Sequence, residues 1–149
     1  MYPAVLPRMW TNVSKDPLLL QQETETYMEC SSRSPDREIG WAAVEISYKA
    51  VNARARLLRP MLPVNIPYRL IPRAEIAADD ARLALKYPGQ WQRRPESMEY
   101  AGVSAVGFDA SKTKAIVYVH LRSEGGVYWI EKRLGKWEYK ARGGCFWIA

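Results

Sequence analysis

The chain has few of the side chains that form metal sites and nucleophilic relays. It contains one histidine, His120, and two cysteines, Cys30 and Cys145. The cysteines form no CxxC pair and have no histidine near them, so neither a zinc motif nor a redox motif is supported. Whether they are joined in an oxidising compartment is left open by the sequence. No Ser, Cys or second His is placed to complete a relay with His120, and we expect neither a cofactor nor a metal.

Long apolar runs are also absent. No run approaches the roughly 20 residues that a membrane-spanning helix needs. The first ten residues are broken by Pro3 and Pro7 and lack the apolar region of a signal peptide. We therefore expect no membrane span and, by default, a cytoplasmic protein, with an exported form left open.

What is present is typical of one globular domain with a real core. The 149 residues are 48% apolar and 26% charged. Six Trp and nine Tyr stand against two Phe. Such amphipathic aromatic residues suit pocket rims and sheet borders, although a core built from large residues would use them equally well.

The positive charge is concentrated in the middle of the chain. Nine basic and three acidic residues lie between Arg54 and Arg94, which accounts for the whole net charge of +6. Arginine suits bidentate contact with carboxylate or phosphate, so the segment predicts an anion-facing surface. A solvated face that keeps the protein soluble is the alternative. The basic residues are Arg54, Arg56, Arg59, Arg69, Arg73, Arg82, Lys86, Arg93 and Arg94, of which Arg69, Arg73, Arg93 and Arg94 are our candidate binding residues.

Three helices are predicted before residue 100. Asp16-Pro17 is typical of a helix start and predicts a helix over residues 17–31. Ser34-Pro35 starts a second helix that should end near residue 58. The stretch "NIPYRLIP" predicts an edge strand or a connector because of its prolines. A third helix, over about residues 73–87, is stopped by Pro88-Gly89.

After Tyr100 the apolar period changes to two, which predicts an antiparallel meander. The strand candidates are "GVSAVGF", "KAIVYVHLR", "GVYWIEKR" and "KWEYKAR", with "CFWIA" as a fifth strand or a continuation. We expect a single α+β domain over residues 1–149. It would have an irregular arm (1–15), a mainly helical part (16–99) and a β-meander (100–149), with two or three helices on one face of four or five strands.

Turn positions predict which residues face each other. A two-residue turn at Glu124-Gly125 would place His120 opposite Trp129 and Tyr118 opposite Glu131. A second one at Leu134-Gly135 would place Ile130 opposite Tyr139, Trp129 opposite Lys140 and Lys132 opposite Trp137. The helices should then cover an apolar face made of Val117, Val119, Leu121, Tyr128, Ile130, Trp137, Tyr139 and Ala141. The opposite, polar face would have Tyr118, His120, Trp129, Glu131, Glu138, Lys140 and Arg142.

The candidate site lies on that polar face. His120 with Glu131 or Tyr118 could perform acid–base chemistry, and Trp129, Tyr118 and His120 could instead line a binding surface. His120 could equally be an ordinary surface residue, because cross-strand polar pairs also stabilise plain sheets. A slip of one residue in register would move His120 into the core.

More than half of the chain resembles a widespread group of small bacterial proteins of unknown function. The matching residues are 106–109 (VGFD), 115–119 (AIVYV), 131–132 (EK), 135–137 (GKW) and a closing Trp-Ile pair. Where members often have a Cys- and Gly-rich hairpin tip, this chain has "RSEGG". A looser likeness is to the NTF2-like and cystatin-like folds, and it implies helices packed on a curved sheet, with a pocket between them in the NTF2-like enzymes.

These observations favour a non-catalytic binding module for an acidic protein or a small anionic ligand. The alternative is a small NTF2-like pocket enzyme, an isomerase, dehydratase or hydrolase. Nucleic-acid binding ranks third. Tyr68, Tyr87 and Trp91 interleave with the arginines as stacking residues would, but Asp79 and Asp80 oppose this and no nucleic-acid motif is present.

Overall fold

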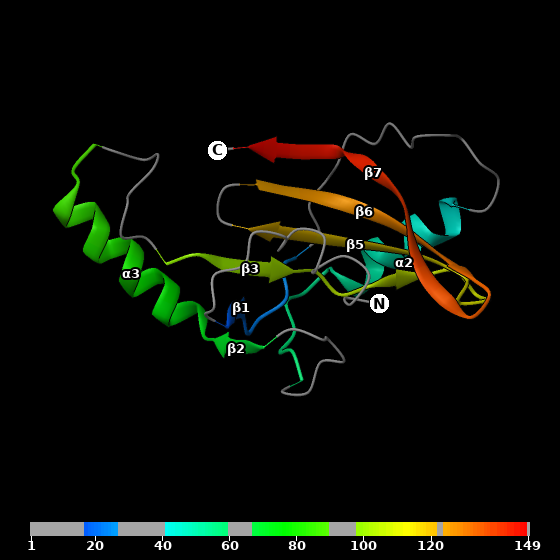
Figure 1. The fold of residues 1–149 in the computed structure, drawn as a ribbon, viewed down its shortest axis with the longest axis horizontal. Coiled ribbons are helices and arrows are strands. Elements are labelled where there is room, and N and C mark those ends of the chain that lie inside the picture. The colour runs from blue at the N-terminus through cyan, green and yellow to red at the C-terminus, as the bar shows by residue number, and fades with distance from the viewer. Residues whose placement is uncertain (1–16, 27–40, 60–66, 90–97, 122–123, 149) are drawn as a thin grey trace.

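The computed structural model describes residues 17–26, 41–59, 67–89, 98–121 and 124–148, of which residues 141–148 are described by their backbone alone (Figure 1). In these residues, two helices and seven strands form an α+β structure around a mostly antiparallel sheet, which confirms the expected class at that level. The helices are α2 (Ala42–Val51) and α3 (Arg73–Lys86). The strands are β1 (Leu18–Gln21), β2 (Tyr68–Ile71), β3 (Tyr100–Val103), β4 (Gly107–Phe108), β5 (Lys114–Leu121), β6 (Glu124–Arg133) and β7 (Lys136–Ile148).

The sheet is larger and less regular than predicted. Its strand order is β2-β1-β3-β5-β6-β7, and β4 pairs with β5 beside this path. Strands β5, β6 and β7 form the predicted meander, and β7 includes both "KWEYKAR" and "CFWIA". Strand β1, in contrast, runs parallel to both of its neighbours, β2 and β3. The expected number of four or five strands is therefore wrong. The expectation that the strands run antiparallel is wrong for β1.

The helix predicted over residues 17–31 is wrong at its start, because Leu18–Gln21 form β1. Leu18 and Leu20 are buried on one face of the sheet. The composition after Pro17 favours a helix, but β1 forms ladders with β2 and β3 on its two sides, and such distant pairing overrides local propensity. Residues 27–31 lie outside the described part of the chain.

The other predicted elements before residue 100 correspond better. Helix α2 lies within the predicted span 35–58, of which residues 35–40 are outside the described part, and it ends early, at Asn52. Helix α3 is confirmed, and β2 is the edge strand that "NIPYRLIP" indicated. Pro67 and Pro72 flank β2, as expected for a strand at a sheet edge.

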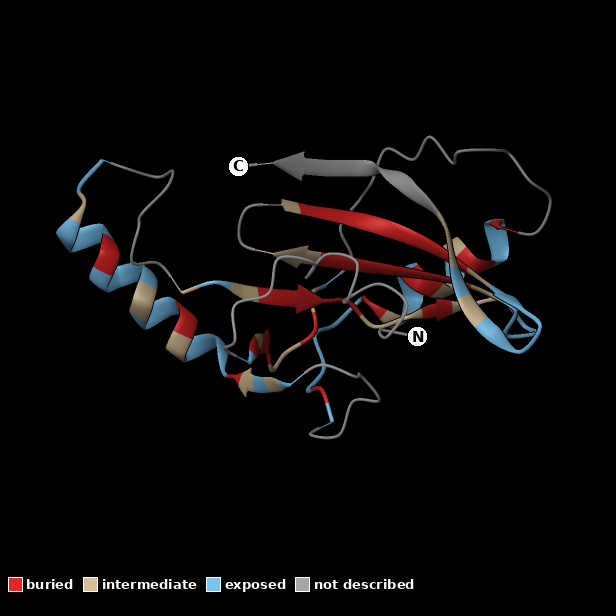
Figure 2. Cartoon of the chain, viewed as in Figure 1, coloured by how far each residue is buried: buried red, intermediate tan, exposed pale blue. Residues whose placement is uncertain are grey.

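Two apolar clusters form on opposite faces of the sheet, and they assign α2 to the face that was predicted to be polar. The first face buries Leu18, Leu20, Leu58, Ala101, Val103, Val117, Val119, Tyr128 and Ile130. The second cluster joins α2 to the sheet through Trp41, Val44, Tyr48, Ile116, Tyr118, Val127 and Trp129. Figure 2 shows the buried parts of β3, β5 and β6 in red.

The expectation that the helices cover the Val117 and Val119 face is therefore wrong for α2. Ile116 and Val127 add to Tyr118 and Trp129 and make the central part of the second face apolar. Gly107 lets the helix approach, because a Cβ at this position would lie 2.3 Å from the Cα of Tyr48.

The two hairpins differ in how well their registers were predicted. At the second, Ile130 faces Tyr139 and Lys132 faces Trp137 as expected. A bulge next to Trp129 then moves it opposite Ala141, where Lys140 was expected.

At the first hairpin, Leu121 pairs with Glu124, so the predicted turn at Glu124-Gly125 is wrong. His120 lies opposite Gly125 and not Trp129, while Tyr118 lies opposite Val127 and not Glu131. The glycines that suggested a turn are strand residues. The shift between β5 and β6 is an even number of residues, so the side chains of these two strands keep their predicted faces.

Candidate functional site

The position of His120 depends on a glycine in the neighbouring strand. His120 on β5 pairs with Gly102 on β3. A Cβ at Gly102 would lie 2.1 Å from Nε2 of His120, so the imidazole lies across the backbone of β3 where a side chain would otherwise be. The rings of Tyr100 and Tyr118 lie on either side, each with its centroid 5.8 Å from that of the imidazole.

The imidazole is directed to a carboxylate that the sequence analysis did not identify. Oε1 of Glu25 lies 3.3 Å from Nε2 of His120. The backbone N–H of Glu25 donates to the carbonyl of Val103 (2.9 Å), which attaches this segment to the end of β3. Gln21 donates its amide to the same Oε1 (2.9 Å), and Nη2 of Arg73 lies 3.8 Å from Oε2. We call Gln21, Glu25, Arg73 and His120 the Glu25 cluster.

The cluster favours an ionised Glu25. The hydrogen bond with His120 holds the pKa of Glu25 below its usual value; burial opposes this, while the His120 charge, Gln21 and Arg73 assist. The side chain of His120 is 12% exposed and that of Glu25 24%, so the pair is partly shielded from solvent. A carboxylate that orients an imidazole can support acid–base chemistry. The same pair can also simply attach the segment after β1 to the sheet.

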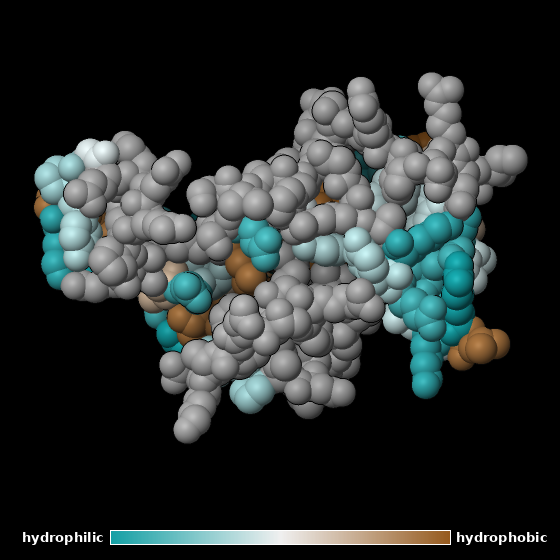
Figure 3. All heavy atoms as spheres, turned by 45° about the horizontal axis from the view of Figure 1, so that its top comes forward, coloured by the Kyte–Doolittle hydropathy of each residue, from teal (hydrophilic) through white to brown (hydrophobic). Residues whose placement is uncertain are grey.

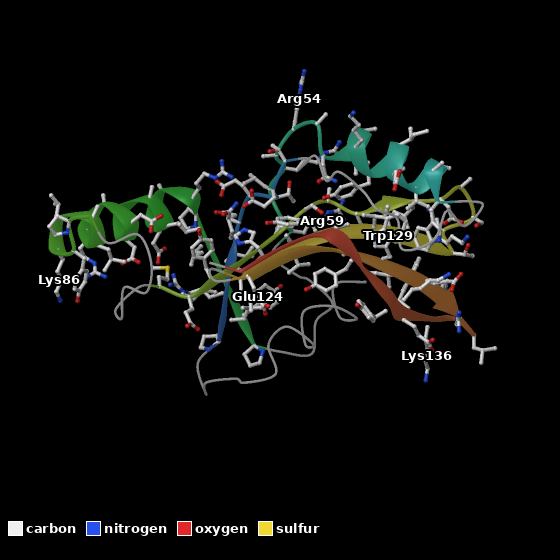
Figure 4. The ribbon with its side chains drawn as sticks, turned by 90° about the horizontal axis from the view of Figure 1, so that it is seen from above. Arg54, Arg59, Lys86, Glu124, Trp129 and Lys136 are labelled. Atoms are coloured by element: carbon white, nitrogen blue, oxygen red, sulfur yellow. The ribbon has the colours of Figure 1, made fainter. Side chains whose placement is uncertain are left out.

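Of the other residues predicted for this site, Tyr118 lies beside the imidazole, whereas Trp129 and Glu131 lie elsewhere. Tyr118 and Trp129 are buried on the face that α2 covers, where Trp129 (labelled in Figure 4) makes an edge-to-face contact with Trp41, with ring centroids 4.5 Å apart. Glu131 faces Lys114 across β5 and binds Arg133, with Oε2 3.2 Å from Nη2. Glu25, 95 residues from His120, occupies the position expected of Glu131. No local sequence signal could have indicated a partner that distant.

Three of the central arginines are engaged with acids of the chain. Arg69 pairs with Glu75 (3.0 Å) and Arg82 with Asp79 (2.7 Å). Arg73 joins the Glu25 cluster, as described above. Arg93 and Arg94 lie outside the described part of the chain. The candidate residues Arg69 and Arg73 therefore each have an internal carboxylate.

Arg54, Arg56 and Arg59 differ from these arginines. All three are exposed, and no carboxylate of the described residues lies within ion-pair distance of them. Their segment, residues 54–59, is attached to residues 22–24 by backbone hydrogen bonds. Thr24 donates to the Arg56 carbonyl (2.7 Å), and Leu58 donates to the Gln22 carbonyl (2.8 Å). Figure 4 shows Arg54 directed away from the ribbon. We call residues 54–59 the arginine segment.

In the described part of the chain, no three His, Cys, Asp or Glu residues are close enough together to hold a metal ion. Neither described helix is long and apolar enough to cross a membrane. Cys30 and the side chain of Cys145 lie outside the described part.

Comparison of the chain with protein-family models, curated proteins and solved structures finds no match. The resemblances named above therefore stay predictions.

Proposed function

We propose that the protein is a non-catalytic binding module that holds an acidic protein or a small anionic ligand on the arginine segment. The observation that supports this most is the contrast between two groups of arginines. Arg69, Arg73 and Arg82 are neutralised within the chain, whereas Arg54, Arg56 and Arg59 have no acid of the described residues beside them.

Attachment of the segment to residues 22–24 strengthens this proposal. Arg56 both donates its backbone N–H to Oγ1 of Thr24 (2.9 Å) and accepts from the Thr24 backbone. Because the backbone is held in place, an anion that binds here orders only the arginine side chains, which lowers the entropic cost of binding. Leu57, 67% exposed between the arginines, adds an apolar contact for a protein partner.

The test is retention on immobilised polyglutamate in a salt gradient. We expect the triple variant Arg54→Gln/Arg56→Gln/Arg59→Gln to elute at clearly lower salt than the wild type. A matched control, Arg69→Gln/Arg82→Gln/Lys86→Gln, removes the same charge from β2 and α3, where Arg69 and Arg82 already have internal carboxylates, and should elute close to the wild type. Equal shifts for the two variants would mean that net charge alone causes retention, and the proposal would be wrong.

A second candidate function is acid–base catalysis at the Glu25 cluster, in the manner of a small NTF2-like pocket enzyme. The hydrogen bond between Glu25 and His120 is the observation that favours it. The proposed NTF2-like fold is supported by the mostly antiparallel sheet with α2 packed on one face. Glu25 takes the role first considered for Glu131, with Tyr118 beside the imidazole. The reaction would be an isomerisation, dehydration or hydrolysis that needs a proton moved at neutral pH.

This second function is tested with three probe substrates, an activated ester, a β-hydroxy ketone and a β,γ-unsaturated ketone. Turnover of any of them should be lost in His120→Ala and Glu25→Gln. Glu131→Gln, a carboxylate away from the cluster, should retain it. Turnover that survives His120→Ala, or the absence of turnover of all three probes, would count against this function.

A further inference from the structure

Two turns lie side by side at one end of the sheet. The first, residues 109–113, joins β4 to β5, and the second, Leu134-Gly135, joins β6 to β7. The backbone N–H of Lys132 donates to the carbonyl of Thr113 (2.7 Å), and Lys114 faces Glu131 across the two strands. Figure 1 shows both turns at the end of the molecule opposite α3. We call residues 109–114 and 131–138 the hairpin end.

Leu134 has an unexpected place at the tip of the second turn. Its side chain is fully exposed, with a relative exposure of 104%. The φ angles of Leu134 and Gly135 are 48° and 80°, so both residues of this tight turn are in the left-handed region. At the first position of such a turn, Asn, Asp or Gly is favoured over Leu. Both the exposed apolar surface and this backbone conformation are unfavourable for Leu, and Asn would avoid both. A conformational outlier of this kind points to a function for the side chain.

Three exposed cations lie in or next to the same two turns as Leu134. Lys112, in the neighbouring turn, is exposed and also has a positive φ of 54°. Arg133 and Lys136 flank Leu134 on its own hairpin and are exposed. Figure 4 shows Lys136 directed outward, and Figure 3 shows a hydrophobic group that projects beside hydrophilic surface at this end.

The acids of the hairpin end do not cancel this charge. Lys112, Lys114, Lys132, Arg133 and Lys136 stand against Asp109, Glu131 and Glu138, so the net charge is 5 − 3 = +2. The Asp109 carboxylate accepts from the backbone N–H groups of Thr113 (2.7 Å) and Lys114 (2.8 Å), and Glu131 binds Arg133. Glu138 lies opposite Glu131, further from the tip than Lys136 is.

We propose that the hairpin end docks reversibly on an anionic lipid surface. Leu134 enters the boundary between headgroups and acyl chains, while Lys112 and Lys136 contact the headgroup phosphates and carboxylates. One apolar side chain is a weak anchor, and several cations supply the second contribution that peripheral binding needs. This proposal is independent of the arginine segment.

A lipid surface suits this tip better than a nucleic acid or an acidic protein. Stacking on bases needs an exposed aromatic face, but Trp137, the aromatic residue beside the tip, is only partly exposed, and Nζ of Lys132 lies 6.0 Å from its ring centroid. A single leucine on a convex turn forms no groove for a peptide. Insertion into a fluid boundary requires neither a groove nor a flat face.

The experiment is co-sedimentation with phosphatidylcholine vesicles, with and without phosphatidylserine. We expect salt-sensitive binding to the anionic vesicles alone. Leu134→Asn, which suits the turn, should lower partitioning about tenfold or more, as expected when a buried leucine is lost. Lys112→Gln/Lys136→Gln should lower it by about tenfold or more at low salt. Leu85→Asn, on α3 and 87% exposed, is the matched apolar control and should bind like the wild type.

The outcomes separate the alternatives. If Leu134→Asn binds anionic vesicles as the wild type does, or if no vesicle binding occurs, the proposal is overturned. Retention of a random single-stranded oligonucleotide that depends on Lys112 and Lys136, without vesicle binding, would assign the surface to nucleic acid instead. Unchanged vesicle binding by the Arg54, Arg56 and Arg59 triple variant would support the hairpin end as a separate site.

Discussion

At the scale of single residues, the imidazole of His120 depends on the absence of a side chain at Gly102. The ring lies where a Cβ would be, and its Nε2 reaches Glu25 from that position. A glycine that faces a histidine on the neighbouring strand is thus part of the site because it has no side chain.

Gly102→Ala tests this arrangement. Alanine in a strand is ordinarily favoured over glycine by about 0.5–1 kcal/mol, but here the methyl group must displace the imidazole. We expect a net loss of about 1–3 kcal/mol in the free energy of unfolding, measured with urea. In the His120→Ala background the clash is gone, so the same change should cost little. Additive effects in this double-mutant cycle would contradict the steric explanation.

The stability that Glu25 contributes should depend on pH. Its pKa is lowered in the folded protein, chiefly by the hydrogen bond with His120. The contribution is therefore present above about pH 4.3, the pKa of a glutamate in the unfolded chain. It is lost as the pH falls through the lower pKa of Glu25 in the folded protein. Urea unfolding of the wild type and Glu25→Gln should differ most above that value and converge in acid. A difference that stays constant or grows towards acid would contradict this.

At the scale of elements, α2 is attached to the sheet by a buried amide. Asn52 donates to the carbonyls of Tyr48 (2.8 Å) and Ala105 (2.9 Å) and accepts from the N–H of Ala105 (2.7 Å). Asn52 is wholly buried. It therefore both ends the helix and joins it to the segment between β3 and β4.

Asn52→Ala should cost about 2 kcal/mol or more in the free energy of unfolding, because a wholly buried amide is removed and the partly buried N–H of Ala105 loses its acceptor. Ser47→Ala is the control on the same helix. It removes the hydroxyl that accepts from the N–H of Phe108 (3.1 Å), in a less buried position, and should cost about 1 kcal/mol or less. Similar losses in the free energy of unfolding for the two variants would contradict a larger contribution from Asn52.

The turn between β4 and β5 should also respond to acid. Slight burial would raise the pKa of Asp109, but hydrogen bonds from Ser111, Lys114 and Thr113 outweigh it and lower the pKa to about 2. The difference in stability between the wild type and Asp109→Asn should be present above about pH 4 and disappear as the pH falls towards 2. Because Asp109 is mostly exposed, we expect this difference in the free energy of unfolding to stay below about 1 kcal/mol. Thermal unfolding in buffers from neutral to acidic pH measures it.

The elements that were predicted correctly are those with local signals. Alternation of apolar residues indicated β5 to β7, and Pro88-Gly89 indicated the end of α3. Strand β1 and the Glu25 cluster were missed for one physical reason. Their partners are remote in sequence, so neither propensity nor spacing records them.

At the scale of the whole molecule, α3 and the sheet differ in how they are held. Strand β5 has neighbours on both edges and is buried over most of its length. Helix α3 extends away from the sheet and is mostly exposed (Figures 1 and 2), with Ile76 and Leu83 as its buried residues. Its first N–H, that of Arg73, donates to Glu23 (3.1 Å).

Native-state hydrogen exchange should therefore be uneven. We expect the amides in the middle of α3 to exchange on the order of 100-fold faster than those in the middle of β5, because fewer buried contacts must open. Equal protection in the two elements would contradict this and would mean that the molecule opens as one unit.

The parallel pairing of β1 has a consequence for the order in which the chain can assemble. Leu18 pairs with Tyr68, 68 − 18 = 50 residues later, and Leu19 with Tyr100, 100 − 19 = 81 residues later. Strand β1 thus gains its second neighbour only after β3 has emerged from the ribosome, whereas β5 to β7 each pair with the strand made just before. Until residue 100 is synthesised, β1 has at least one open edge, and this interval is when a nascent chain is most exposed to pairing with a wrong strand.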